Sequence, residues 1–209
     1  MKLYFVRHGE SEANVIREIS NRGWKHPLTE KGRQQAQTLA AALKEAGTVK
    51  IYTSPLMRAV QTAQILAETL RLDYAITPAL REYDCGVIEG RGDPEAWELH
   101  RRVREDWILR GLFHERIAEG ESFYEIRDRF LPFIEGLLAG AEDGSPVLVG
   151  HGGLYVTMLP LILPGVTSEW AYRQPFPNSG WVLAERTPSG ALTCLEWCGK
   201  PFSGTWLKN

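Results

Sequence analysis

Two short apolar runs in this chain end in basic side chains. Residues 3–6 are followed by Arg7 and His8, and residues 146–149 lead through a glycine to His151. Short runs of Val, Leu and Phe bounded by glycine are typical of strands buried on both faces. Such strands hold the residues that follow them at the carboxyl edge of a sheet, where open α/β folds bind ligands. The arginine and the two histidines are therefore candidate site residues.

Arg58 is a further basic candidate, in the first turn of a predicted helix. Ser54 and Pro55 come before this helix, and proline suits a first turn because its missing N–H loses nothing there. A positive charge at this point is repelled by the positive end of the helix dipole. We therefore expect Arg58 to have a role other than stabilising its helix.

If the strands are neighbours, Arg7, His8, Arg58 and His151 reach one pocket. Clustered positive charge is unfavourable unless an anion of several charges neutralises it. Phosphate fits, because arginine binds its oxygens in pairs and the first turn of a helix offers free N–H groups. Asn14 lies in the next loop and is a candidate neutral donor to the same phosphate. The acidic Glu82 lies in an irregular segment that could overhang the pocket.

The elements around these residues alternate between strand and helix. This alternation predicts an α/β sandwich around a largely parallel sheet. A turn signal at residues 187–190 separates the last two strands, which form a predicted hairpin. Residues 14–26 are a predicted loop, and Pro132 is expected to bend or break its helix. The predicted strands are 3–7, 49–53, 74–76, 146–150, 181–184 and 192–197, and the main predicted helices are 29–47, 55–70, 95–116 and 121–139.

Composition limits the class of protein. The chain has 209 residues, 44% of them hydrophobic and 24% charged, with a formal net charge of -2. These values are ordinary for a soluble globular protein and favour neither nucleic acid nor a membrane surface as partner. The three cysteines imply no disulfide framework, and the first strand leaves no room for a signal peptide. We expect a reduced, cytoplasmic protein.

Two groups of residues are given no role in the site at this stage. The arginines of the predicted helix 95–116 are interpreted mainly as its solvated face. The histidines outside the two strand ends have no partner at metal-ligand spacing, and we expect no metal site and no cofactor. These histidines are His26, His100 and His114.

Several short blocks, in this order, resemble the histidine phosphatase superfamily, also known as the phosphoglycerate mutase-like family. Arg7-His8-Gly9-Glu10-Ser11 with Asn14 is similar to its signature. The further blocks are residues 28–32, 54–63, 80–82, 120–122 and 150–152. The resemblance implies a three-layer α/β/α sandwich around a mostly parallel mixed sheet. It also implies a single domain over 1–209, with a helical cap insertion at about 91–119.

The resemblance also implies a role for each candidate. His8 is expected to be a nucleophile that becomes phosphorylated, and Glu82 to be the general acid. Arg7, Arg58 and His151, together with Asn14, are expected to hold the phosphoryl group. A protonated His151 would add positive charge there without a metal.

Three functions remain open from the sequence. The leading one is a metal-independent phosphomonoester hydrolase that acts through phosphohistidine on a small phosphorylated metabolite. A cofactor-dependent phosphoglycerate mutase would use the same intermediate, and a non-catalytic phosphate-ligand binding protein could share the fold. Ala13 and Ile88 stand where the family often has tryptophan, so the resemblance does not extend to the leaving group. Oligomeric state is likewise open.

Overall fold

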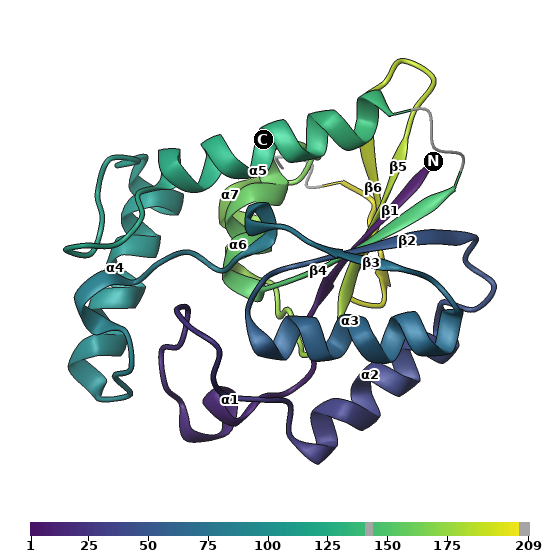
Figure 1. The fold of residues 1–209 in the computed structure, drawn as a ribbon. Helices are drawn as coiled ribbons and strands as arrows, with labels where there is room; N and C mark the ends of the chain where they lie inside the picture. The colour runs from purple at the N-terminus through teal and green to yellow at the C-terminus, as the bar shows by residue number, and fades with distance from the viewer. Residues whose placement is uncertain (141–143, 205–209) are drawn as a thin grey trace.

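A mixed sheet organises the molecule (Figure 1). The computed structural model describes residues 1–140 and 144–204. The sheet has seven strands in the order β3-β2-β4-β1-β5-β6-β7. The first four in this order pair in parallel, and the remaining pairings are antiparallel, so the predicted α/β class is confirmed. The strands are β1 (Lys2–Arg7), β2 (Thr48–Thr53), β3 (Tyr74–Ile76), β4 (Ser145–Gly150), β5 (Trp181–Arg186), β6 (Leu192–Trp197) and β7 (Lys200–Pro201).

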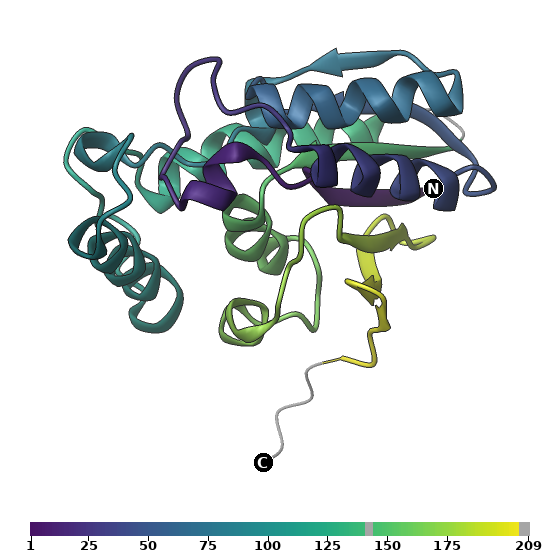
Figure 2. The same ribbon diagram turned by 90° about the horizontal axis from the view of Figure 1, so that it is seen from below.

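Helices cover both faces of this sheet, which makes three layers (Figures 1 and 2). Successive side chains of a strand point to opposite faces. Accordingly, Leu3 and Phe5 of β1 join the larger core, under α5, α6 and α7, whereas Tyr4 and Val6 join a second core under α2 and α3. The helices on these two faces are α5 (Phe123–Ala139), α6 (Gly152–Met158), α7 (Ser168–Arg173), α2 (Glu30–Ala42) and α3 (Met57–Leu70).

Two local predictions were wrong, one on the end of a helix and one on a loop. The helix expected to reach residue 116 is α4 (Pro94–Arg110), and it ends where Gly111 takes a left-handed conformation with φ of 69°. Part of the predicted loop 14–26 belongs to a short helix, α1 (Glu12–Ile16), which ends at the left-handed Arg17. Helix α5 continues through Pro132 without a break, so of the bend or break expected there only the bend stays a prediction.

The sheet brings the basic strand ends together. Arg7 is paired with Gly150, so the residues that follow β1 and β4 are neighbours. Thr53, at the end of β2, pairs with Val149, and α3 begins a few residues later. Helix α4 lies beyond these strand ends, to one side of the sheet (Figures 1 and 2). The space between the strand ends and α4 contains the candidate site.

Candidate active site

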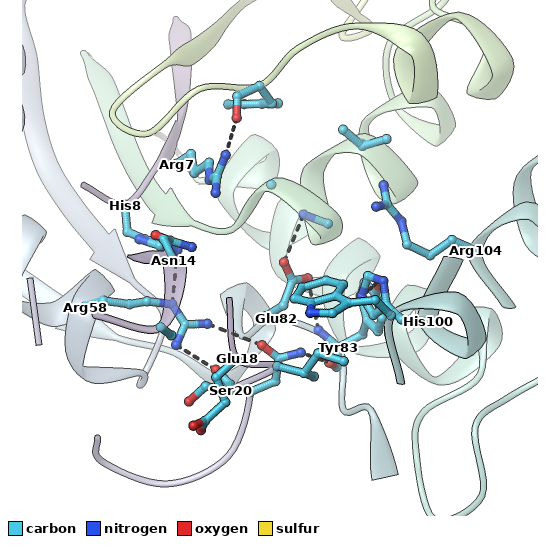
Figure 3. A pocket seen from close by; sticks show the side chains of 18 of the residues that line it. Arg7, His8, Asn14, Glu18, Ser20, Arg58, Glu82, Tyr83, His100 and Arg104 are labelled. Carbon is cyan, nitrogen blue, oxygen red and sulfur yellow. Dashed lines mark hydrogen bonds between the residues drawn. The ribbon is translucent and has the colours of Figure 1, made fainter. Parts of the chain in front are cut away.

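A pocket of about 440 Å³ opens at the carboxyl ends of β1 and β4 (Figure 3). Five of the six predicted site residues line it: Arg7, His8, Asn14, Arg58 and Glu82. The sixth, His151, is not among the residues that line the pocket, and it is hydrogen bonded to Arg58. The predicted residues are thus brought together from four separate parts of the chain.

The His8 ring is held in one tautomer. Its Nδ1 lies 2.7 Å from the carbonyl oxygen of Gly9, and because a carbonyl only accepts, Nδ1 carries the hydrogen. The lone pair on Nε2 accepts a hydrogen bond from Nε of Arg58 at 3.1 Å. Burial lowers the pKa of His8 well below its usual value, and the charges of Arg58 and Arg7 lower it further. The imidazole is therefore neutral near pH 7, with a lone pair on Nε2.

The loop after His8 is fixed by a close approach between two backbones. A Cβ on Gly9 would lie 2.4 Å from the carbonyl oxygen of Gly32, in the first turn of α2. A Cβ on Gly32 would lie 1.9 Å from the carbonyl oxygen of Glu10. The Gly9 N–H donates to Oγ1 of Thr62 on α3 at 3.1 Å. Glycines at these two positions let the loop pack directly on the helix layer, which holds His8 in place.

Arg58 connects the two histidines to the loop after α1. Its guanidinium donates to the carbonyl oxygen of Ser20 at 2.7 Å, to Oδ1 of Asn21 at 3.3 Å and to Nδ1 of His151 at 3.4 Å. Burial lowers the pKa of Arg58 to about 10, which still leaves it charged at pH 7. This buried charge explains an arginine at the start of α3, where the helix dipole disfavours it.

His151 is neutral in this arrangement. It is 1% exposed, and its ring centroid lies 5.0 Å from that of His8. Since Nδ1 accepts from Arg58, Nε2 carries the hydrogen and donates to Oγ of Ser54 at 2.7 Å. Burial, followed by the charge of Arg58, lowers the pKa of His151 well below its usual value. The protonated His151 expected beside a phosphoryl group stays a prediction, since a dianion nearby would oppose these effects on the pKa.

Arg7 and Asn14 have hydrogen-bond donors for which the described residues provide no acceptor. The guanidinium of Arg7 donates to the carbonyl oxygen of Phe176, but its buried Nε has no partner among the described residues. Oδ1 of Asn14 accepts hydrogen bonds from the Ser11 N–H and from Nδ2 of Asn178, the latter at 3.2 Å. The NH2 group of Asn14 therefore points away from these two donors. An oxyanion in the pocket would satisfy such donors.

Glu82 reaches the pocket from the segment after β3. Its Oε2 accepts from the Gly153 N–H at 2.9 Å, and its Oε1 from the Tyr83 N–H at 3.1 Å. Burial raises the pKa of Glu82, although these hydrogen bonds and the nearby Arg104 and Arg58 partly oppose the rise. A carboxyl group with a raised pKa holds a proton more readily near neutral pH, as a general acid requires.

The sequence interpretation missed the wall that α4 contributes. Trp97, His100 and Arg104 of this helix all line the pocket, as does Tyr172 of α7. A signal was present, because His100 lies on the same helical stripe as the apolar residues of α4 and therefore points inward. The inward-facing apolar residues are Ala96, Val103 and Trp107. Arg104 lies at the edge of this stripe, one helical turn after His100.

Among residues 1–140 and 144–204, no group of three or more His, Cys, Asp or Glu side chains is arranged to hold a metal ion. None of the helices found there has the length and apolar character needed to cross a membrane.

The sequence that forms this pocket, with its strand-end Arg-His pair, second histidine and helix-borne arginine, was compared with known families. The sequence profile of the histidine phosphatase superfamily (branch 1) matches residues 3–198. The chain belongs to this superfamily, as the resemblance of its motifs predicted.

Relatives with assigned names include both mutases and phosphatases. The chain is 37% identical over 169 residues to a probable phosphoglycerate mutase GpmB of Proteus mirabilis, covering 78% of this chain and 75% of the relative. Its structure is similar to that of a mycobacterial glucosyl-3-phosphoglycerate phosphatase in complex with VO3, with a TM-score of 0.81, 26% identity and coverage of 95% and 99%. It is also similar to Bacillus stearothermophilus YhfR, with a TM-score of 0.80, 26% identity and coverage of 96% and 98%.

Proposed function

We propose that this protein is a metal-independent phosphomonoester hydrolase that forms a phosphohistidine on His8 and acts on a small phosphorylated metabolite. The observation that carries the proposal is the state of the His8 ring. Its Nδ1–H is bound to the Gly9 carbonyl, so the lone pair of a neutral imidazole lies on Nε2, among two arginines and a carboxyl group that can hold a proton. A neutral imidazole is a competent nucleophile.

The first step transfers the phosphoryl group to His8. The phosphate dianion replaces Nε2 of His8 as the acceptor of the Arg58 hydrogen bond and takes further donors from Arg7 and Asn14. Nε2 then attacks phosphorus, the N–P bond forms and the P–O bond to the leaving group breaks. Glu82 gives its proton to the leaving oxygen, so the product leaves as an alcohol. The arginines stabilise the equatorial oxygens, which is the main requirement of phosphoryl transfer.

The second step returns the enzyme to its starting state. Glu82, now a carboxylate, takes a proton from a water molecule, and the water oxygen attacks phosphorus. The N–P bond breaks, inorganic phosphate leaves and the lone pair returns to Nε2 of His8. Glu82 is again protonated. Every atom and proton is accounted for by substrate, water and these side chains, so the proposal requires no metal or cofactor.

Trapping the intermediate tests this proposal. Brief incubation with p-nitrophenyl phosphate in the presence of EDTA should release phosphate and leave an acid-labile phosphoryl group on His8, located by rapid quench and mass spectrometry. His8→Ala should fold and lose nearly all activity. A phosphoryl group on another residue, or activity that a chelator removes and one metal restores, would refute the proposal.

A phosphoglycerate mutase is the second candidate, because a relative at 37% identity is named a probable phosphoglycerate mutase. A mutase would use the same phosphohistidine but return the phosphoryl group to a different oxygen of the acceptor. Incubating the protein with 3-phosphoglycerate, with and without 2,3-bisphosphoglycerate, separates the two candidates. Release of inorganic phosphate supports the hydrolase, and conversion to 2-phosphoglycerate without release supports the mutase.

A further inference from the structure

Glu89 lies in the segment between β3 and α4, and the two proposed chemical steps do not use it. It is half-buried, and within residues 1–140 and 144–204 it forms no ion pair. Its Oε2 accepts a hydrogen bond from the Asn21 N–H at 2.8 Å, and its Oε1 accepts one from the Cys85 N–H at 3.2 Å. Burial raises the pKa of Glu89, but both hydrogen bonds favour the carboxylate and oppose the rise. Glu89 therefore joins two segments that are far apart in the chain.

The loop that Glu89 binds contains two acceptors of Arg58. The carbonyl oxygen of Ser20 accepts from the guanidinium at 2.7 Å (Figure 3), and Oδ1 of Asn21 accepts from it at 3.3 Å. The same guanidinium donates through Nε to Nε2 of His8 at 3.1 Å. The donors of a guanidinium lie in one plane, so two fixed acceptors set the direction of the others. Residues 20 and 21 therefore set how Arg58 presents its donors to a phosphoryl group.

Glu89 holds this loop at the residue where the side-chain acceptor originates. Ile19 exchanges backbone hydrogen bonds with residues 90 and 91 at 2.8 and 2.9 Å, but these lie two residues before Asn21. In the described part of the chain, the N–H of Asn21 has Glu89 as its acceptor, and its Nδ2 donates to the carbonyl oxygen of Tyr83 at 3.0 Å. With the backbone and Nδ2 both held, Oδ1 of Asn21 is fixed toward the guanidinium.

The charge of Glu89 does not explain its presence here. Its negative charge reaches Arg58, because it raises the pKa of that arginine, after the larger effect of Glu82. A negative charge so close to a phosphate site disfavours a dianion, since like charges repel. The benefit of Glu89 therefore lies in the two N–H groups that it binds.

We propose that Glu89 is a positioning residue for phosphoryl transfer: its carboxylate fixes the backbone of Asn21 and thereby aims the guanidinium of Arg58 at the phosphoryl group. This inference rests on the proposed function, in which Arg58 stabilises the equatorial oxygens. It adds a residue that acts on the reaction without lining the pocket.

Glu89→Gln and Glu89→Asp test this role in different ways. Glutamine keeps the length but has one acceptor oxygen for two N–H donors, whereas aspartate keeps the charge but is one methylene shorter. Both variants should slow the phosphorylation burst by about 5- to 30-fold, because Arg58 is no longer held in place. An alkyl phosphate and p-nitrophenyl phosphate should be slowed equally, since Arg58 acts on the group they share. A wild-type burst in Glu89→Asp would show that only the charge matters and would overturn the inference.

A double-mutant cycle separates positioning from a general structural role. In an Arg58→Ala protein, adding Glu89→Gln should slow the burst with p-nitrophenyl phosphate by no more than about 2-fold, because the group that Glu89 positions is gone. Arg58→Lys is the alternative background if the alanine variant does not fold, since an amine lacks the fork that binds both Ser20 and Asn21. Equal slowing by Glu89→Gln with and without Arg58 would mean that Glu89 only stabilises the fold, and the inference would fail.

Glu125→Gln is the matched control. The carboxylate of Glu125 also accepts from a backbone N–H, that of Ser122 at 2.8 Å, but Glu125 does not line the pocket. The same change of carboxylate to amide should therefore leave the bursts within about 2-fold of wild type.

Vanadate binding separates a failure of this inference from a failure of the proposed function. Calorimetric titration with vanadate needs no turnover. Glu89→Gln should weaken vanadate binding by about 5- to 30-fold when Arg58 is present and by no more than about 2-fold in Arg58→Ala. If no phosphohistidine forms, the proposed function fails, yet an Arg58-dependent loss of vanadate affinity still supports the role of Glu89. Unchanged or tighter vanadate binding in Glu89→Gln would overturn it.

Discussion

Gly153→Ala should displace the proposed acid without touching the nucleophile. A Cβ at Gly153 would lie 2.7 Å and 2.8 Å from the two carboxylate oxygens of Glu82, and 2.7 Å from Cε1 of Tyr83. An ordinary contact begins at 3.4 Å, so 3.4 minus 2.7 leaves a shortfall of 0.7 Å. Tyr83 is 2% exposed, so its ring has little room. The carboxyl group of Glu82 must therefore make most of the movement, away from the Gly153 N–H that now binds it.

The size of the effect follows from this displacement. A misplacement of about 1 Å costs roughly 100-fold in rate, and general acid catalysis contributes about 100- to 10,000-fold in total. We expect Gly153→Ala to slow phosphorylation of His8 by an alkyl phosphate by about 10- to 100-fold. p-Nitrophenyl phosphate, whose leaving group is stable as an anion, should be slowed by no more than about 3-fold, because it needs little help from an acid.

The assay is a rapid-quench measurement of the phosphorylation burst. The steady state is unsuitable because Glu82 is also proposed to activate water in the second step. Gly136→Ala on α5 is the control, since its Cβ would meet nothing within 4 Å, and it should retain wild-type bursts. Equal slowing of both substrates by Gly153→Ala, or no slowing of either in the folded variant, would refute the assignment of Glu82 as the leaving-group acid.

Three further predictions concern the surroundings of the nucleophile. Asn21→Ala removes a side chain that is hydrogen bonded to both Arg58 and the Tyr83 carbonyl. It should slow the reaction of alkyl phosphates and of p-nitrophenyl phosphate by about 5- to 30-fold. It should also lower the free energy of unfolding, measured in urea, by about 1–3 kcal/mol. Because the pKa of Glu82 is raised, the burst with an alkyl phosphate should be largest below that pKa and fall as pH rises through it, and Glu82→Gln should remove this dependence. Vanadate binding should raise the pKa of His151, which burial and the charge of Arg58 lower, and NMR titration of its ring protons would measure the change.

Each of these three has an outcome that contradicts it. An Asn21→Ala variant that slows only the alkyl phosphate would show that Asn21 acts through Glu82 and not through Arg58. A burst that falls with pH to the same extent in Glu82→Gln would assign the titration to another group. Ring proton shifts of His151 that are the same with and without vanadate would mean that the dianion does not reach its surroundings.

Much of this protein was accessible from its sequence, because the relevant signals are local. A buried strand is recognised by its own apolar residues, and a basic residue at its end is recognised by adjacency, so Arg7, His8 and His151 could be placed at one sheet edge. The position of Arg58 could be predicted because a proline and a helical repeat mark the start of its helix. The α/β class followed from the alternation of such elements.

The remaining features depend on contacts between residues that are far apart in the chain. Arg58 is hydrogen bonded to Asn21, and Glu82 to Gly153. Both hydrogen bonds involve loops whose conformations no local sequence pattern specifies. The protonation state of His151 depends on its burial and on the neighbouring guanidinium of Arg58. Neither can be predicted from the residues adjacent to His151 in the sequence. Arg104 has the same sequence signature as the solvated arginines beside it. Only the packing of α4 across the pocket separates it from them, because a side chain at the edge of a helical stripe is exposed or enclosed according to what lies opposite.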